Sequence, residues 1–117
     1  MRMTNPISNG PDHRRACSEV AATARGMLAA SLGIVEGARR LARLRFDVKG
    51  EADADLLFFV GLDSQTDHLP LGDVRQRWSR EALRVKDEEL RDFEASVRDK
   101  AFRICRNLLL KYETHTA

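Results

Sequence analysis

Five aspartates and one histidine in the middle of the chain carry the side chains best suited to chemistry. They are Asp53, Asp55, Asp63, Asp67, Asp73 and His68. Carboxylate oxygens are the preferred ligands of hard cations such as Ca²⁺, but the step from Asp63 to Asp67 lacks the alternating oxygen ligands, central Gly and terminal Glu of a calcium loop. Aspartates in turns often accept hydrogen bonds from nearby backbone N–H groups. We therefore expect structured turns here, with neither a metal nor another cofactor.

Catalysis has little support in the residue pattern. His68 could act as a general base, but no Ser or Cys nucleophile accompanies it in a recognisable arrangement. The two cysteines, Cys17 and Cys105, fall on apolar helical stripes, where burial disfavours the reactive thiolate. They are too few and too far apart in sequence for a disulfide framework or a zinc site. The sequence therefore predicts a protein that is not an enzyme.

A basic cluster precedes the acidic segment and gives an alternative hypothesis. It consists of Arg39, Arg40, Arg43 and Arg45. Arg39 and Arg43 are four residues apart on one helix face, as phosphate contacts would be. No Gly-rich phosphate loop or exposed aromatic ladder accompanies them, and residues 50–78, with six acidic residues against two arginines, can neutralise them. Internal pairing is the favoured interpretation, and a nucleic-acid-binding regulator is the alternative.

Apolar periodicity predicts long helices on either side of this middle segment. Small and apolar residues recur every three or four positions from Cys17 to Ala42, which predicts one helix over residues 12–46. Gly33 and Gly37 indicate either close approach of another helix or a break near Ser31–Gly33, with the unbroken helix favoured. Farther on, the pattern predicts a short helix over 73–78, begun by an Asp73 capping box, and a long helix over 80–112 capped by Ser79.

These elements predict an all-α protein with a single helical domain over residues 12–113. Its architecture should be an antiparallel hairpin of two long helices or a small helical bundle, with a structured irregular cross-connection over about residues 50–72. Within that connection Leu56–Leu62 is expected to be extended or a single turn. Pairing Phe46 with Ser79 would bring Cys17 level with Leu108. Two helices make a thin core, so a broken first helix, a packed middle segment or a homodimer is also expected.

Length and composition agree with one small globular domain. The 117 residues are 43 % apolar and 32 % charged, which is enough for a packed core and a solvated surface. Residues 1–11 are expected to form a flexible tail without the apolar centre of a signal peptide. No apolar run approaches the roughly 20 residues of a membrane span. A cytoplasmic location without membrane contact is therefore expected.

Two sequence stretches carry a family resemblance. They are Gly37-Ala-Arg-Arg-Leu and Phe59-Val-Gly-Leu-Asp-Ser-Gln-Thr-Asp-His-Leu-Pro-Leu-Gly, followed by Arg75 and Trp78. Over about residues 30–112 the chain resembles a group of small bacterial helical proteins of unassigned activity. In size and build it also resembles the immunity proteins that neutralise contact-dependent growth inhibition toxins. The resemblance implies an immunity or antitoxin protein that binds and occludes a toxin domain, with a nuclease as one candidate partner.

The acidic middle segment is the predicted partner-binding surface. Its net charge of −4 would attract a basic toxin domain, and its large aromatic residues could anchor an interface. The predicted contact residues are Asp53, Asp55, Asp63, Asp67, His68, Asp73 and Trp78.

Overall fold

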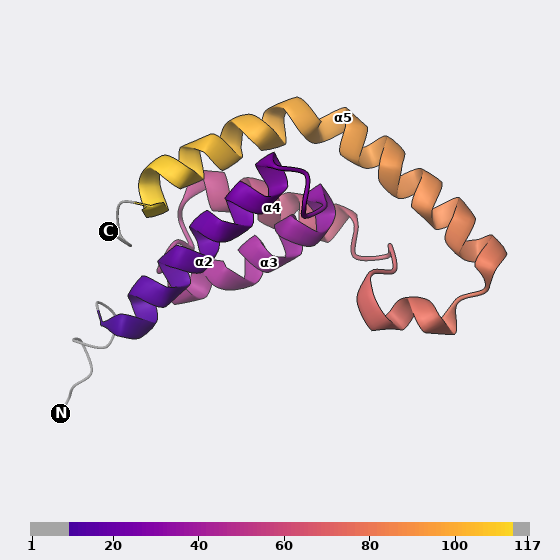
Figure 1. The fold of residues 1–117 in the computed structure, drawn as a ribbon, viewed down its shortest axis with the longest axis horizontal. Helices are drawn as coiled ribbons and strands as arrows, with labels where there is room; N and C mark the ends of the chain where they lie inside the picture. The colour runs from indigo at the N-terminus through magenta and orange to yellow at the C-terminus, as the bar shows by residue number, and fades with distance from the viewer. Residues whose placement is uncertain (1–9, 114–117) are drawn as a thin grey trace.

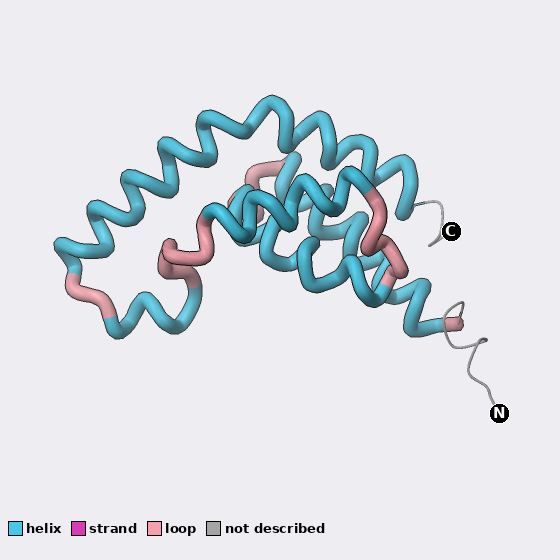
Figure 2. Tube along the Cα trace, turned by 180° about the vertical axis from the view of Figure 1, so that it is seen from behind, coloured by secondary structure: helices cyan, strands magenta, loops and turns pink. Residues whose placement is uncertain are grey.

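The computed structural model of the chain describes residues 10–113, and every regular element within that range is a helix (Figure 2). The elements are α2 (Pro11–Leu28), α3 (Ile34–Asp47), α4 (Ala54–Gln65), the 3-10 helix η1 (Gly72–Arg77) and α5 (Arg80–Tyr112). The predicted all-α class is confirmed, in its small-bundle form. Residues 1–9 of the tail that was predicted at residues 1–11 lie outside the described range.

The first long helix of the prediction is in fact two helices. The unbroken helix over 12–46 is wrong, and the break lies at residues 29–33, where the alternative placed it. Ala30 adopts a φ of 60°, the left-handed conformation that terminates helices. The N–H groups of Ser31 and Leu32 then both donate to the Gly26 carbonyl, at 3.0 and 3.1 Å. This turn sends α3 back alongside α2 (Figure 1).

The middle segment contains a helix that the sequence analysis missed. Residues 50–72 are not irregular throughout, because α4 occupies Ala54–Gln65. Asp53 begins α4 by accepting a hydrogen bond from the Asp55 N–H at 2.9 Å. The run from Leu56 to Leu62 is apolar on every side of the helix, so it shows no periodicity, and its apparent shortness favoured an extended segment.

The core lies between α2, α3, α4 and the C-terminal part of α5. Fully buried large side chains from the first three helices include Met27, Leu41 and Phe59. The buried residues of α5 all come late in that helix, at Ala101, Ile104, Cys105, Leu108 and Tyr112. Both cysteines are free and buried, and Cys105 Sγ lies 3.9 Å from Met27 Sδ.

The predicted register between the long helices is wrong. It paired Phe46, near the end of α3, with Ser79, just before α5. In the structure the beginning of α3 meets the middle of α5, because the Val35 N–H donates to Glu94 Oε2 at 2.9 Å. Since α3 folds back along α2, it does not extend along the first turns of α5. Those turns consequently have no long helix beside them (Figure 1).

The remaining helix boundaries agree closely with those predicted from the sequence. The short helix predicted at 73–78 is η1, and Ser79 caps α5 by accepting from the Ala82 N–H at 3.1 Å. The Asp73 capping box is wrong, since Leu71 precedes η1 and no side chain caps it. None of the helices in residues 10–113 combines the length and apolar character needed to cross a membrane.

Candidate partner-binding surface

Residues 71–100, which we call the arm, extend away from the core, and the base of the arm at Phe93 and Val97 packs against the core cluster (Figure 1). The arm consists of η1 and the N-terminal turns of α5 (Figure 1). No residue from Leu71 to Lys100 is buried, whereas Ala101 is completely buried. The arm makes the molecule elongated, at 54 × 30 × 22 Å. Its Cα radius of gyration is 15.8 Å, compared with about 13 Å for a compact domain of this length.

The arm continues the apolar stripe of α5 without a core to cover it. Leu83, Leu90 and Val97 are seven residues apart, so they lie on the same helix face as Ile104 in the core. All three are partly buried, but only Val97 packs against the core cluster. Trp78 is also partly buried and, with Leu83, occupies the positions of a hydrophobic staple around the Ser79 cap. The arm thus holds large apolar side chains that solvent still reaches.

An ion pair and side-chain hydrogen bonds hold η1 and the preceding loop against the arm's part of α5. The Arg75 guanidinium donates to both carboxylate oxygens of Asp87 at 2.8 Å, and to the Pro70 carbonyl at 3.2 Å. His68 Nε2 lies 2.6 Å from Glu89 Oε2. The hydrogen bonds from Arg75 lower the pKa of Asp87, and the bond from His68 lowers the pKa of Glu89. These contacts give the arm a defined shape in place of a hydrophobic core.

Glu94 fastens the base of the arm to the bundle. Its carboxylate accepts the Val35 N–H at 2.9 Å, next to the N-cap residue Gly33, which provides no capping side chain. The free N–H groups and the positive end of the helix dipole both favour a carboxylate at this position. Glu94, which is 59 positions from Val35 in sequence, therefore caps α3.

Two of the predicted partner-binding aspartates instead join α4 to the end of α5. Asp53 accepts from Lys111 Nζ at 2.6 Å and from the Tyr112 hydroxyl at 2.8 Å. Asp55 lies 2.8 Å from the same Lys111. Burial alone would raise the pKa of Asp53, but hydrogen bonds from Lys111, Tyr112 and the Asp55 N–H outweigh it and lower that pKa. These groups stabilise the fold and are already paired.

The other predicted residues are separated from Asp53 and Asp55, and those on the arm lie at the opposite end of α5. Asp87, the partner of Arg75 in η1, precedes Lys111 by 24 helical residues, which is about 36 Å along α5. Asp63 lies 3.5 Å from Arg39 Nε. Asp67 and Asp73 are exposed. The predicted surface is therefore divided: Asp53 and Asp55 are remote from the arm, whereas Asp73 and Trp78 belong to it and His68 is bonded to it.

The four arginines of the alternative hypothesis do not form one basic surface. Arg39 donates to the carbonyls of Thr66 and Leu69, the latter at 2.9 Å, and so orders the loop after α4. The Arg45 guanidinium lies 4.0 Å from the centre of the Phe46 ring. Arg40 pairs with Glu36 at 2.9 Å. Arg39 thus contacts the acidic segment, as the interpretation of internal pairing expected, whereas Arg40 and Arg45 contact neighbours within α3.

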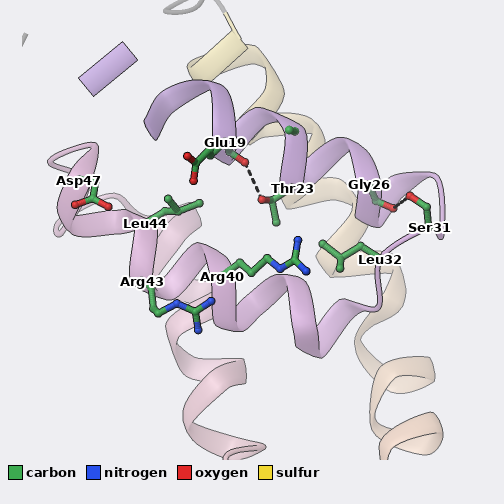
Figure 3. A pocket seen from close by; sticks show the side chains of 10 residues that line it. Glu19, Thr23, Gly26, Ser31, Leu32, Arg40, Arg43, Leu44 and Asp47 are labelled. Atoms are coloured by element: carbon green, nitrogen blue, oxygen red, sulfur yellow. Dashed lines mark hydrogen bonds between the residues drawn. The ribbon is translucent and has the colours of Figure 1, made fainter. Parts of the chain in front are cut away.

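Arg40 and Arg43 line an open groove between α2 and α3. Figure 3 shows both side chains on α3, with Arg40 extending toward Thr23 of α2 and Asp47 at one end. The groove has a volume of about 740 Å³. Its two basic residues are matched by two acidic ones, so its walls have no net preference for an anion.

Chemically reactive groups are sparse in the described chain. Residues 10–113 contain no group of three or more His, Cys, Asp or Glu side chains placed to hold a metal ion. Burial raises the pKa of both thiols, to about 12 for Cys105. A thiol with such a pKa stays protonated at neutral pH and is a poor nucleophile.

The polar contacts that shape the arm were not predicted from the sequence. Asp87 and Glu94 lie on the same helix face as Leu83, Leu90 and Val97. A carboxylate on an apolar stripe needs a partner, and this position was the available indication that each one contacts another element.

Comparisons with protein-family models, with curated proteins and with solved structures gave no match to this chain. Any assignment of function therefore depends on the chain's own residues and contacts.

Proposed function

We propose that this chain is a non-enzymatic protein-binding module whose arm forms the interface with the partner. The observation that carries this proposal is the absence of any buried residue between Leu71 and Lys100, although Trp78, Leu83 and Leu90 are large and apolar. Partly exposed apolar residues on a defined support are typical of interfaces, in which aromatic anchors fill pockets on the partner.

The charges of the arm favour a protein partner over a polyanion. Residues 71–100 contain eight acidic and eight basic side chains, so the arm has no net charge. Asp73 is exposed within it, and Asp67 is exposed in the loop just before it, so both could form the polar rim of the interface. Because Asp53, Asp55 and Asp63 are paired within the chain, we expect affinity from the apolar stripe more than from acidic steering.

We further propose that the partner is a bacterial toxin domain and that the chain acts as its immunity protein. This step is supported by the chain's resemblance, in size and build, to the immunity proteins that neutralise contact-dependent growth inhibition toxins. An immunity protein needs no reaction chemistry of its own, because covering the toxin's active or docking surface is sufficient. A rigid arm on a small bundle suits such occlusion.

The test uses the toxin domain encoded by the neighbouring reading frame. Co-expression of this chain should protect cells from that domain, and titration calorimetry should show a one-to-one complex. Leu90→Glu should weaken binding by about a hundredfold, and Trp78→Ala by about tenfold or more, if they are central anchors. A neighbouring frame that encodes no toxin, or a toxin that this chain neither binds nor neutralises, would refute the immunity assignment.

A matched control comes from the same helix. Leu110 is 75 % exposed on the part of α5 that covers the core, so Leu110→Glu places the same charge outside the arm. This variant should bind and protect like the unmodified chain. If Leu110→Glu abolished binding and Leu90→Glu did not, the interface would lie elsewhere and the arm would lose its assigned role.

A nucleic-acid-binding role makes a different prediction in the same experiment. Binding that depends on phosphate contacts weakens steeply as salt increases. An interface anchored by Leu83 and Leu90 should change little between low and physiological salt, since exposed charges contribute modestly. Arg39 and Arg45 are already engaged within the chain.

A further inference from the structure

One histidine joins the loop after α4 to the arm. His68 Nε2 lies 2.6 Å from Glu89 Oε2 on α5, and both side chains are 46 % exposed. The loop end of this contact is fixed, because Arg39 of α3 donates to the carbonyls of Thr66 and Leu69, which lie on either side of the histidine. Both of these loop residues are buried. His68 therefore connects a loop that is anchored to the bundle with a helix segment that has no buried residue.

The other polar contacts of the arm keep the same charge near neutral pH. Arg75 donates to both carboxylate oxygens of Asp87 at 2.8 Å. Glu94 accepts the Val35 N–H at 2.9 Å. A guanidinium stays protonated at any ordinary pH, and carboxylates are ordinarily ionised above about pH 5, whereas histidine is the side chain whose charge changes between about pH 5 and 8. Among the polar contacts between the arm and the rest of the described chain, only the one at His68 can therefore change charge in this range.

Charged side chains lie on every element next to the loop that holds His68. They are Glu89 and Lys86 on α5, Asp67 in the loop itself, Arg75 on η1, Asp63 on α4 and Arg39 on α3. Asp63 lies 3.5 Å from Arg39, so Glu89 is the acid in contact with the histidine. Lys86 Nζ lies 3.5 Å from the other oxygen of that carboxylate. The bond from His68 lowers the pKa of Glu89, which keeps this carboxylate ionised while the histidine changes charge.

We propose that the His68–Glu89 contact is a pH-dependent link that fastens the arm to the bundle more tightly below neutral pH than above it. Protonated His68 forms an ion pair with the carboxylate, and charge-assisted hydrogen bonds are about twice as strong as neutral ones. As the pH rises toward about 8, the imidazole becomes neutral and this attraction is lost. The link belongs to the free chain. It also makes the shape of the partner-binding surface sensitive to pH, and that consequence alone rests on the proposed function.

Hydrogen–deuterium exchange of the free chain at two pH values tests the link. Protection of the amides from residue 80 to residue 90 is expressed relative to an unstructured chain at the same pH. It should be about two- to fivefold higher at about pH 5.5 than at about pH 8, the range expected for an exposed ion pair. His68→Gln keeps a donor for Glu89 but cannot gain a charge, so its protection should be nearly equal at the two pH values. Glu89→Gln, which keeps an acceptor, should remove the difference as well.

The matched control is the same substitution at the other described histidine. His13→Gln changes α2 and should leave the pH dependence of the arm intact. Because His68 and Glu89 are exposed, both of their variants should fold, which circular dichroism can verify. Equal protection of the unmodified chain at the two pH values would overturn the proposal. A pH dependence that survives in His68→Gln, or that is lost in His13→Gln alone, would overturn it too. None of these results would affect the proposed role of the arm, which the toxin experiment tests separately.

Discussion

Glu94 is the side chain through which the arm is joined to the bundle. Its carboxylate accepts the Val35 N–H at the start of α3, where Gly33 supplies no cap of its own. Loss of a helix-capping side chain destabilises proteins by about 1 kcal/mol. We therefore predict that Glu94→Ala lowers the free energy of unfolding by about 1 kcal/mol, and that Glu94→Gln, which keeps an acceptor but loses the charge, has a smaller effect. Urea denaturation followed by circular dichroism measures both.

The control for Glu94 is an exposed glutamate of the same helix. Glu88→Ala removes an equal charge from α5 at an exposed position, so its unfolding midpoint should stay close to that of the unmodified chain. Equal destabilisation by both substitutions would mean that the effect comes from the charge of α5 and not from the cap on α3.

Asp53 should make stability depend on acid pH. Its side chain is only 12 % exposed and is bonded to Lys111 and Tyr112. Burial raises the pKa of Asp53, but these bonds and the Asp55 N–H more than offset it, so the folded-state pKa is below the ordinary value. A depressed carboxylate pKa stabilises the fold above the unfolded-state pKa of about 4, and this contribution is lost as the pH falls through the folded-state pKa.

Asp53→Asn should therefore reduce stability at neutral pH by about 1 kcal/mol. The difference from the unmodified chain should shrink as the pH decreases below about 4. Denaturant midpoints measured at several pH values provide the comparison, with Asp67→Asn, a change at an exposed aspartate, as control. A difference that stayed constant down to the lowest pH would show that the charge of Asp53 contributes nothing.

Two glycines within helices should respond in opposite directions to the same substitution. A Cβ at Gly61 of α4 meets open space, so Gly61→Ala should stabilise the fold by about 0.5–1 kcal/mol through helix propensity. A Cβ at Gly37 of α3 would overlap the buried Met27, so Gly37→Ala should destabilise the fold by about 1 kcal/mol or more. Thermal denaturation of dilute samples compares the pair. The same sign for both would show that the α2–α3 contact adapts at little cost.

The elements with one apolar face were the ones that could be predicted. The periodicity and the Ser79 cap defined α5 almost to the residue, because one stripe of that helix faces the core. The apolar run of α4 shows no period, and this helix was therefore missed. The glycines allowed an α2–α3 break near Ser31–Gly33, but the unbroken helix was favoured, because the break depends on Ala30 in a left-handed conformation that non-glycine residues seldom adopt.

The candidate partner-binding surface was also predictable only in part, because residues close in sequence are separated in the fold. Trp78, Asp67 and Asp73 were expected at the partner surface and do lie on or beside the arm. Asp53 and Asp55 were grouped with them by sequence proximity, but α4 separates the two sets, and Lys111, far along the chain, pairs with the first. Leu83 and Leu90 belong to the same periodic stripe as the core residues of α5, so the sequence does not distinguish them from those residues. They remain only partly buried because α3 folds back along α2.

At the scale of the whole molecule, one continuous helix should have two levels of stability. Residues 101–112 of α5 include five that are buried in the core, whereas residues 80–100 include none. Backbone amides exchange with solvent through local opening where few apolar contacts hold a segment, and through global unfolding where the core holds it. We predict that amides near Leu108 exchange only through global unfolding, and that amides from Leu83 to Leu90 exchange much faster.

Hydrogen–deuterium exchange with peptide-level mass spectrometry can test this gradient and connect it to function. In the free chain, protection should fall from the end of α5 toward its beginning. When the toxin domain of the neighbouring reading frame is added, protection should rise mainly between Leu71 and Lys100, because the interface would supply the packing that the arm lacks. Uniform protection along free α5 would contradict the two-level description. A complex that protected α2 and α3 while leaving the arm unchanged would move the partner-binding surface away from Trp78 and Leu90.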